Sequence, residues 1–141
     1  MKLLKFLPLL AWLWMPSVAQ AEQMVKLGDW DVHYMALTSS FLTPEVARTY
    51  GIQRSKYNAL INISVLDAQS KKPQNLVVEG VAKNLLGTTK KLNFKEIIEG
   101  EAIYYIAVLP FRDQEQYNFI IELSDGNQQE VLSFRQKFYA D

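Results

Sequence analysis

In residues 58–66 every second side chain is apolar, and the polar residues Asn62 and Ser64 lie between them. This pattern constrains the fold more than any other feature of the chain. The apolar side chains that share one side of an extended backbone are Ala59, Ile61, Ile63 and Val65. Successive side chains of a strand point to opposite faces, so this period of two predicts a half-buried β-strand. The remaining segments predicted as strands are 28–37, 75–86, 90–97, 102–109, 117–123 and 130–138.

Turn signals separate these segments. Asp125-Gly126-Asn127 is a strong hairpin turn, because glycine accepts a positive φ without a Cβ clash. About seven short strands predict an all-β domain, and an immunoglobulin-like antiparallel β-sandwich fits best. A closed, lipocalin-like barrel is the alternative. The polar faces around Asn62 and Arg135 argue against a membrane barrel.

One short helix is predicted in the first crossover of the sandwich. Thr43 can cap its N-terminus, Pro44 fits the first helical position and Gly51 can end it in a left-handed conformation. The predicted helix, 44–50, is too short to be stable alone in water, so it must be held by packing.

The first 21 residues have the pattern of a secretory signal peptide. Lys2 and Lys5 precede the apolar run 6–15, and Ala19-Gln20-Ala21 offers a small-x-small cleavage site. The run is about half of the roughly 20 residues needed to cross a bilayer, which argues against a membrane anchor. We therefore expect residues 1–21 to be cleaved and 22–141 to form a single β-sandwich domain.

Composition excludes several classes of function. Two of the 15 basic residues lie in the leader, against 15 acidic residues, so the mature chain is nearly neutral and nucleic acid is not an expected partner. The chain has no cysteine, hence no disulfide, no thiolate nucleophile and no lipid attachment site after the leader. No phosphate-binding or dinucleotide motif is present, and no cofactor is expected.

Catalytic and metal sites are also not expected. His33 is the only histidine, and it shares a predicted strand face with Asp29 and Asp31. A strand spreads such side chains in parallel, about 6.5–7 Å apart, whereas a metal needs converging ligands. An exposed polar strand face is the favoured interpretation.

The helix and its flanks form the candidate binding site, where cations and hydroxyl groups lie close together in the sequence. The candidate residues are Ser39, Ser40, Glu45, Arg48, Tyr50, Arg54, Ser55 and Lys56. Such a set could bind a carboxylate or phosphate, because arginine makes two-point contacts. The alternative is structural: Arg54 would pair with Glu45 or cap backbone carbonyls.

The same region carries a family resemblance. The matching residues are His33-Tyr34, Ser39, Ser40, Leu42, Pro44-Glu45-Val46-Ala47, Tyr50-Gly51-Ile52, Arg54-Ser55-Lys56 and Asn62-Ile63-Ser64-Val65. With these features the chain resembles a family of small exported proteobacterial proteins catalogued as domain of unknown function 4426. The resemblance implies an exported bacterial domain, in the periplasm, and it brings no activity with it.

These observations predict a non-enzymatic periplasmic binding or accessory module that presents the segment Ser39–Lys56. Its partner would be an envelope protein or a small anionic ligand, and after leader cleavage it would not be an integral membrane protein. Two alternatives stay open, namely a carboxylate-dependent envelope hydrolase and a carrier of a small apolar ligand.

Overall fold

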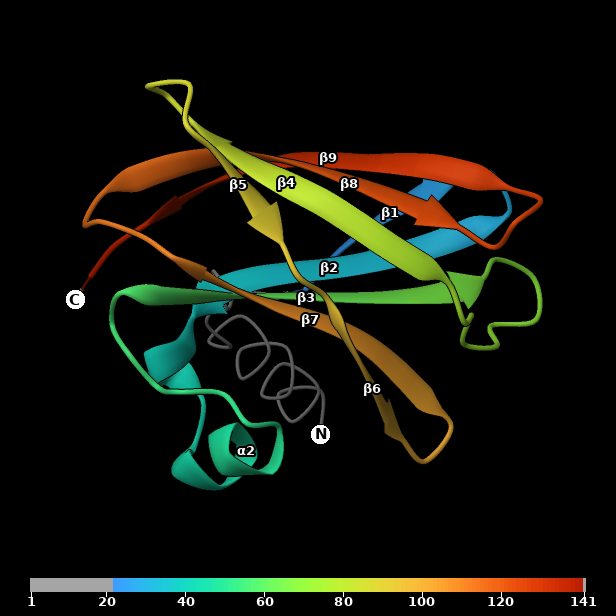
Figure 1. The fold of residues 1–141 in the computed structure, drawn as a ribbon. Coiled ribbons are helices and arrows are strands. Elements are labelled where there is room, and N and C mark those ends of the chain that lie inside the picture. The colour runs from blue at the N-terminus through green and yellow to red at the C-terminus, as the bar shows by residue number, and fades with distance from the viewer. Residues whose placement is uncertain (1–21, 141) are drawn as a thin grey trace, which may run out of the picture.

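The computed structural model describes residues 22–140, which form two antiparallel sheets packed face to face (Figure 1). The predicted leader, 1–21, lies outside the described residues. Sheet A contains, in spatial order, β1 (Gln23–Leu27), β2 (Trp30–Thr38), β3 (Asn58–Asp67), β7 (Ala102–Pro110) and β6 (Lys95–Glu99). Sheet B contains β5 (Thr89–Leu92), β4 (Val77–Asn84), β8 (Glu115–Ser124) and β9 (Gln129–Phe138).

The order of the strands is that of an immunoglobulin sandwich. β2-β3-β7-β6 take the places of strands A-B-E-D, and β4-β8-β9 take those of C-F-G. The predicted all-β sandwich is confirmed. Within residues 22–140 it has nine strands rather than about seven.

Three of the nine strands, β1, β5 and β6, differ from the prediction for physical reasons. β1 was not predicted, because it is short and its side chains are mostly exposed. The single strand expected at 90–97 is divided, since the chain leaves sheet B after Leu92 and enters sheet A at Lys95. Phe94 packs against the core between them. Asn93 is the one residue of low strand propensity at the crossing, and it alone does not indicate a change of sheet.

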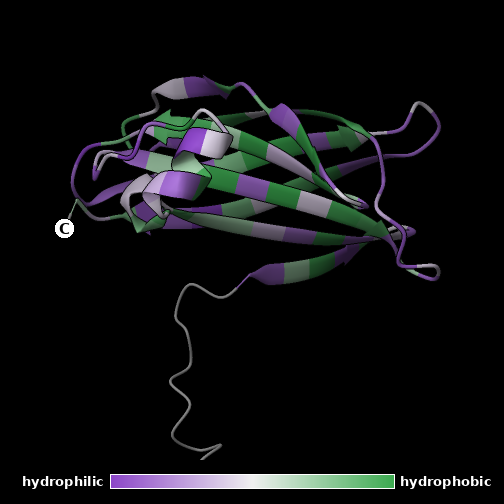
Figure 2. Ribbon diagram, turned by 90° about the horizontal axis from the view of Figure 1, so that it is seen from below, coloured by the Kyte–Doolittle hydropathy of each residue, from purple (hydrophilic) through white to green (hydrophobic). Residues whose placement is uncertain are grey.

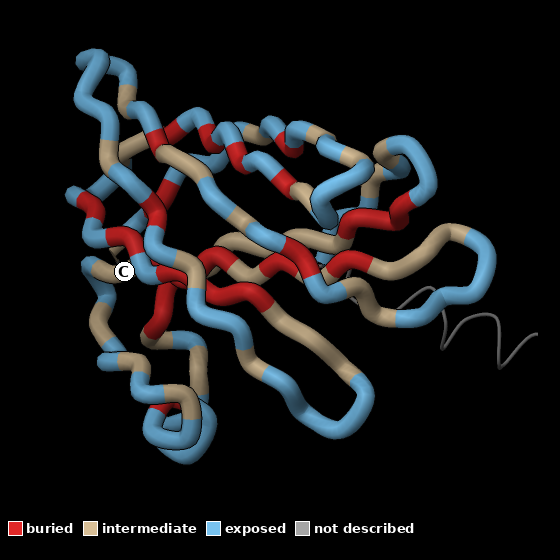
Figure 3. The backbone as a smooth tube through the Cα atoms, turned by 45° about the vertical axis from the view of Figure 1, so that its right-hand side comes forward, coloured by how far each residue is buried: buried red, intermediate tan, exposed pale blue. Residues whose placement is uncertain are grey.

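The core lies between the sheets and follows the alternation read from the sequence (Figures 2 and 3). Ala59, Ile61 and Ile63 are fully buried. Rings fill the space opposite them: Phe119 and Phe134 stack with centroids 4.6 Å apart. Gly80 allows β4 and β8 to approach closely, because a Cβ there would lie 2.8 Å from Ile121 Cγ1.

The helical segment lies on the face of sheet A that points away from sheet B (Figure 1). It comprises η2 (Ser39–Phe41) and α2 (Pro44–Thr49). Thr43 caps α2, accepting a hydrogen bond from the backbone of Val46 at 3.2 Å, and Gly51 follows with φ +68°. Ala47, on α2, is buried outside the central core.

The connection that contains α2 does not cross between the sheets as expected. β2 and β3 are hydrogen-bonded neighbours in sheet A, so the helix bridges two strands of one sheet. η2 contacts β3, and Leu60 of β3, on the side of the strand opposite the core residues Ala59 and Ile61, is only 4% exposed.

Asp31 corrects a second expectation. It was placed on an exposed polar face, but it is only 3% exposed. Lys71, on the loop between β3 and β4, donates to its Oδ2 at 2.6 Å, and Lys26 Nζ lies 3.7 Å from Oδ1. A carboxylate can be buried here because a cation is bound to it.

Candidate functional site

Ser39 holds the two flanks of the helical segment together. It is fully buried, and its hydroxyl lies 3.0 Å from the carbonyl oxygen of Ser55 and 3.2 Å from that of Gln53. The backbone N–H of Ser55 donates to the Ser39 oxygen at 3.0 Å. Ser39 therefore joins the chain before α2 to the chain after it, and it faces no solvent.

Arg54 supports the same connection. Its Nη2 donates to the carbonyl oxygen of Ser40 at 3.0 Å, which is one of the two structural roles considered for it. The other role, an ion pair with Glu45, is not found among residues 22–140, where the ion pairs are Lys26–Asp31, Lys71–Asp31 and His33–Glu22.

The other two cations of the candidate set lie in different surroundings. Lys56 Nζ lies 5.3 Å from the ring centroid of Tyr57, a cation–π distance. Arg48 belongs to the last turn of α2, where a cation complements the partial negative charge of the helix end. The three cations thus interact with three different groups: a backbone carbonyl, an aromatic ring and a helix end.

Tyr50 links the helical segment to a distant strand. It caps the C-terminus of α2, and its hydroxyl donates to Oε2 of Glu99 at the end of β6. This hydrogen bond to a carboxylate raises the pKa of Tyr50, because it favours the protonated phenol. β6 also approaches the end of the helical segment at Gly51. A Cβ atom added to Gly51 would lie 3.9 Å from Lys95 Nζ.

A cleft opens between α2 and β6, and we call it the α2–β6 cleft. Its volume is about 390 Å³, and its lining residues are Glu45, Val46, Thr49, Tyr50, Ile98 and Glu99. Val46 is 40% exposed and Ile98 is 63% exposed, so the cleft offers aliphatic surface between two carboxylates. Such a site suits an apolar side chain that has a cationic neighbour.

The cleft contains two predicted site residues, Glu45 and Tyr50, and several that sequence reasoning missed. Ile98 and Glu99 lie just after the strand predicted at 90–97, and neither was a candidate site residue. Their role depends on a contact between residues 49 positions apart. The one sequence feature that could have indicated an exposed apolar surface here is the pair Ile97-Ile98 among charged residues.

β6 also has an unused edge. It is the last strand of sheet A and pairs with β7 on one side, while no strand of the described chain pairs with its other side. The free N–H and C=O groups of such an edge can accept an additional strand from a partner.

Two other depressions contain no predicted site residue. A groove of about 420 Å³ crosses the outer face of sheet B above Gly80 and is flanked by Glu79 and Glu122. A polar pocket of about 310 Å³ lies between the loops at Asp29 and Asp67.

Among the described residues, no three histidine, cysteine, aspartate or glutamate side chains gather in a group that could hold a metal ion. His33 Nδ1 lies 3.0 Å from Oε1 of Glu22, and Asp31 is bound to Lys71. Within the same part of the chain, neither helical segment is long and apolar enough to span a bilayer.

Known proteins resemble this chain in sequence and in fold. Residues 24–141 match the family described as Domain of unknown function (DUF4426). A crystal structure of a DUF4426 family protein from Pseudomonas aeruginosa PAO1 is 36% identical, with a TM-score of 0.77, covering 87% of this chain and 98% of that one. No curated protein matches in sequence.

More distant structures share the fold alone. FetP of uropathogenic Escherichia coli strain F11, expressed in the periplasm of E. coli, is 12% identical with a TM-score of 0.59, over 84% of this chain and 94% of that one. A copper-bound variant of FetP is also 12% identical, with a TM-score of 0.58, over 84% and 90% of the two chains.

Proposed function

The chain belongs to the DUF4426 family, and from its cleft and its fold we propose that it is a non-enzymatic binding or accessory module of the periplasm. In this proposal the segment Ser39–Lys56 and strand β6 together present a binding surface to an envelope protein.

The α2–β6 cleft carries this proposal. Val46 and Ile98 expose aliphatic surface, while the carboxylates of Glu45 and Glu99 line the same space. A matching partner segment would be extended, with an apolar side chain next to lysine or arginine. Its backbone could pair with the free edge of β6 while its side chain enters the cleft.

The rigidity of the helical segment supports a role in recognition. The buried Ser39 hydroxyl and the Arg54–Ser40 hydrogen bond fix the flanks of α2, so binding would order few residues. Preorganised surfaces lose less entropy on association. Because Arg54 is bonded to a carbonyl and the cleft is lined by carboxylates, the proposal names a protein partner rather than a small anion.

The periplasmic location is proposed from the pattern of residues 1–21. Intact mass measurement on the protein from the producing cell tests it. We expect a chain that begins at Glu22, and a protein that keeps Met1 would contradict export through a cleaved leader.

Site-specific photo-crosslinking in the producing cell tests the binding role. A photoreactive residue at Ile98 should crosslink to one defined protein, and Val46→Asp should abolish that crosslink by placing a charge in the cleft. The same photoreactive residue at Val131, which is 49% exposed on the outer face of sheet B, is the matched control. The cleft would lose its assigned role if both positions gave the same products, or if neither gave any.

A further inference from the structure

The hairpin between β4 and β5 exposes two adjacent leucines. Leu85 is 75% exposed, and Leu86, at 92%, is the most exposed large apolar side chain in residues 22–140. The hairpin projects beyond the body of sheet B (Figure 1). Single exposed apolar residues are common, but two adjacent leucines at a projecting tip indicate contact with another apolar phase.

Asn84 holds the tip in this conformation. Its Oδ1 accepts hydrogen bonds from the backbone N–H groups of Leu86 at 3.1 Å and Thr88 at 2.9 Å. Gly87 completes the turn with φ +88°, a conformation that glycine adopts without strain. The leucines therefore stay at the tip and cannot fold back onto the core.

Cations lie directly behind the leucines, on the outer face of sheet B. Lys83 is paired with Asn118, and Asn118 is paired with Arg135, so one row across three strands carries two positive charges. Arg135 Nε donates to Asn118 Oδ1 at 3.1 Å. Lys91, beside Val81, adds a third charge one row further from the tip.

The carboxylates of this face lie further from the tip. Glu79 and Glu122 face each other across β4 and β8. Glu79 lies four positions from Lys83 along β4, about 13 Å, which exceeds the Debye length of roughly 8 Å at physiological salt. Lys91 lies closer to these carboxylates, because it is paired with Val81 and lines the same groove as Glu79 and Glu122. Glu115 lies close to the tip, where it accepts hydrogen bonds from Tyr117 and Asn84. Asp113 accepts a hydrogen bond from the backbone N–H of Ala140.

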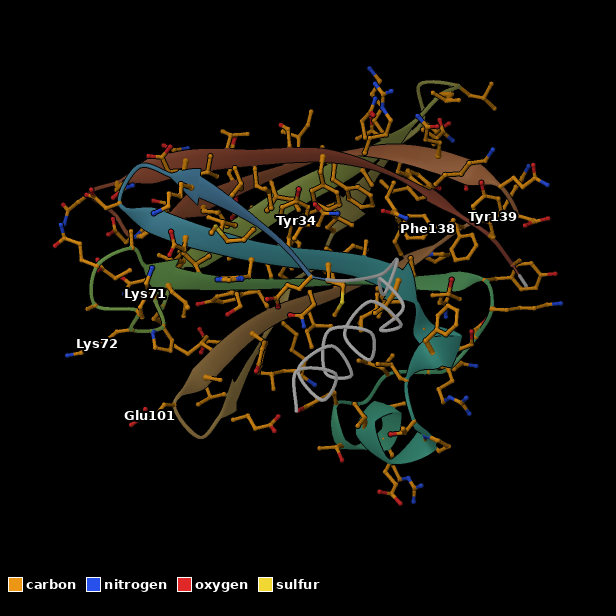
Figure 4. All side chains as sticks on the ribbon, turned by 180° about the vertical axis from the view of Figure 1, so that it is seen from behind. Tyr34, Lys71, Lys72, Glu101, Phe138 and Tyr139 are labelled. Carbon is orange, nitrogen blue, oxygen red and sulfur yellow. The ribbon has the colours of Figure 1, made fainter. Side chains whose placement is uncertain are left out.

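The same end of the sandwich carries an exposed aromatic residue. Tyr139, just after β9, is 49% exposed, and Lys137 Nζ lies 5.5 Å from its ring centroid. Figure 4 shows Tyr139 at the end opposite Lys71 and Glu101. Tyrosine and lysine together are typical of protein surfaces at a membrane–water interface.

We propose that the β4–β5 hairpin is a membrane-docking site. Leu85 and Leu86 would enter the boundary between headgroups and acyl chains of an anionic bilayer, while Lys83, Lys91 and Arg135 contact lipid phosphates. A lipid surface fits better than a protein pocket, because the leucines project from a convex tip with cations behind them. Apolar insertion and charge attraction are each weak alone, and together they give stable attachment.

Vesicle binding by the processed protein, purified from the periplasm, tests this proposal. Vesicles of phosphatidylglycerol mixed with phosphatidylcholine should bind it, and phosphatidylcholine vesicles should bind it much more weakly. Leu85→Ser with Leu86→Ser should weaken binding tenfold or more. Lys83→Gln and Lys91→Gln should each weaken it about fivefold.

Two matched controls give the result its specificity. Lys72→Gln removes a charge at the opposite end of the molecule, and Ile98→Ser removes an exposed aliphatic side chain from the α2–β6 cleft. Both should bind vesicles like wild type. Because Val46→Asp should abolish the crosslink from position 98 and keep vesicle binding, this proposal and the proposed function can fail independently.

A fluorescent reporter shows insertion directly. Trp30 is the only tryptophan after the leader and is buried, so Leu86→Trp adds one exposed reporter whose emission should shift to the blue with anionic vesicles. The proposal is overturned if wild type does not bind anionic vesicles at low salt, or if the serine variant binds equally well. It is also overturned if the tip variants lose a protein crosslink while vesicle binding is unchanged.

Discussion

Ser39 is a small polar side chain that acts on structure rather than on a ligand. The sequence placed it among candidate anion-binding hydroxyl groups. In the structure it is fully buried and bonded to the backbone of Ser55. A side chain's burial depends on which segments meet above it, and the pattern of Ser39-Ser40 before a helix does not contain that information.

Ser39→Ala should destabilise the domain by about 1–3 kcal/mol, because it leaves the part-buried backbone N–H of Ser55 without its partner and removes the link to the carbonyl groups of Gln53 and Ser55. Urea unfolding measures this change. Ser40→Ala is the matched control, since Ser40 contributes its backbone carbonyl to Arg54, and it should change stability by about 0.5 kcal/mol or less. Equal effects of the two substitutions would contradict the role given to the Ser39 hydroxyl.

Asp31 makes the stability of the domain depend on pH. The Lys71 ammonium bound to its carboxylate lowers the pKa of Asp31 below the ordinary value of 3.8. A carboxyl group with a lowered folded-state pKa stabilises the fold above its unfolded pKa, and this contribution is lost as pH falls through the folded-state pKa. The contribution of Asp31 is therefore complete at neutral pH.

Asp31→Asn should lower the melting temperature at pH 7, and its difference from wild type should shrink as the pH is brought below 3.8. Thermal unfolding monitored by circular dichroism over this range provides the measurement. Asp29→Asn, in the exposed neighbouring turn, should follow wild type throughout. A difference that stays constant down to acid pH would show that Asp31 does not act through its charge.

Individual elements differ in how far sequence alone defines them. α2 was predictable because Thr43, Pro44 and Gly51 act locally, and β3 because apolar side chains recur at every second position from Ala59 to Val65. The crossing between β5 and β6 was not predictable, since a single turn-favouring residue, Asn93, marks the change of sheet and no glycine or proline accompanies it. The β6 wall of the cleft was missed for a related reason, because it meets α2 only through the tertiary fold.

β4 and β8 offer a test of the sheet packing. Gly80→Ala would place a Cβ 2.9 Å from the carbonyl oxygen of Ile120, so the strands must move apart. We expect a loss of about 1–3 kcal/mol in the free energy of unfolding. Glu79→Ala, next to it on the exposed outer face, should have little effect. A stable Gly80→Ala variant would mean that the strands are further apart than described.

The whole molecule is a rigid sandwich with two separate exposed surfaces. The α2–β6 cleft lies on the outer side of sheet A, and the β4–β5 hairpin projects from sheet B (Figure 1). A module attached to a lipid surface through its hairpin would keep the cleft free for a protein. The two proposals are thus compatible, although each rests on its own residues.

The affinity for the protein captured through Ile98 tests the central claim most directly. Isothermal titration of that purified protein should show that Val46→Asp weakens binding tenfold or more, because a charge replaces an aliphatic contact in the cleft. Val131→Asp, at a valine of similar exposure on sheet B, should bind like wild type. If Val46→Asp bound as tightly as wild type, the α2–β6 cleft would not be the binding site.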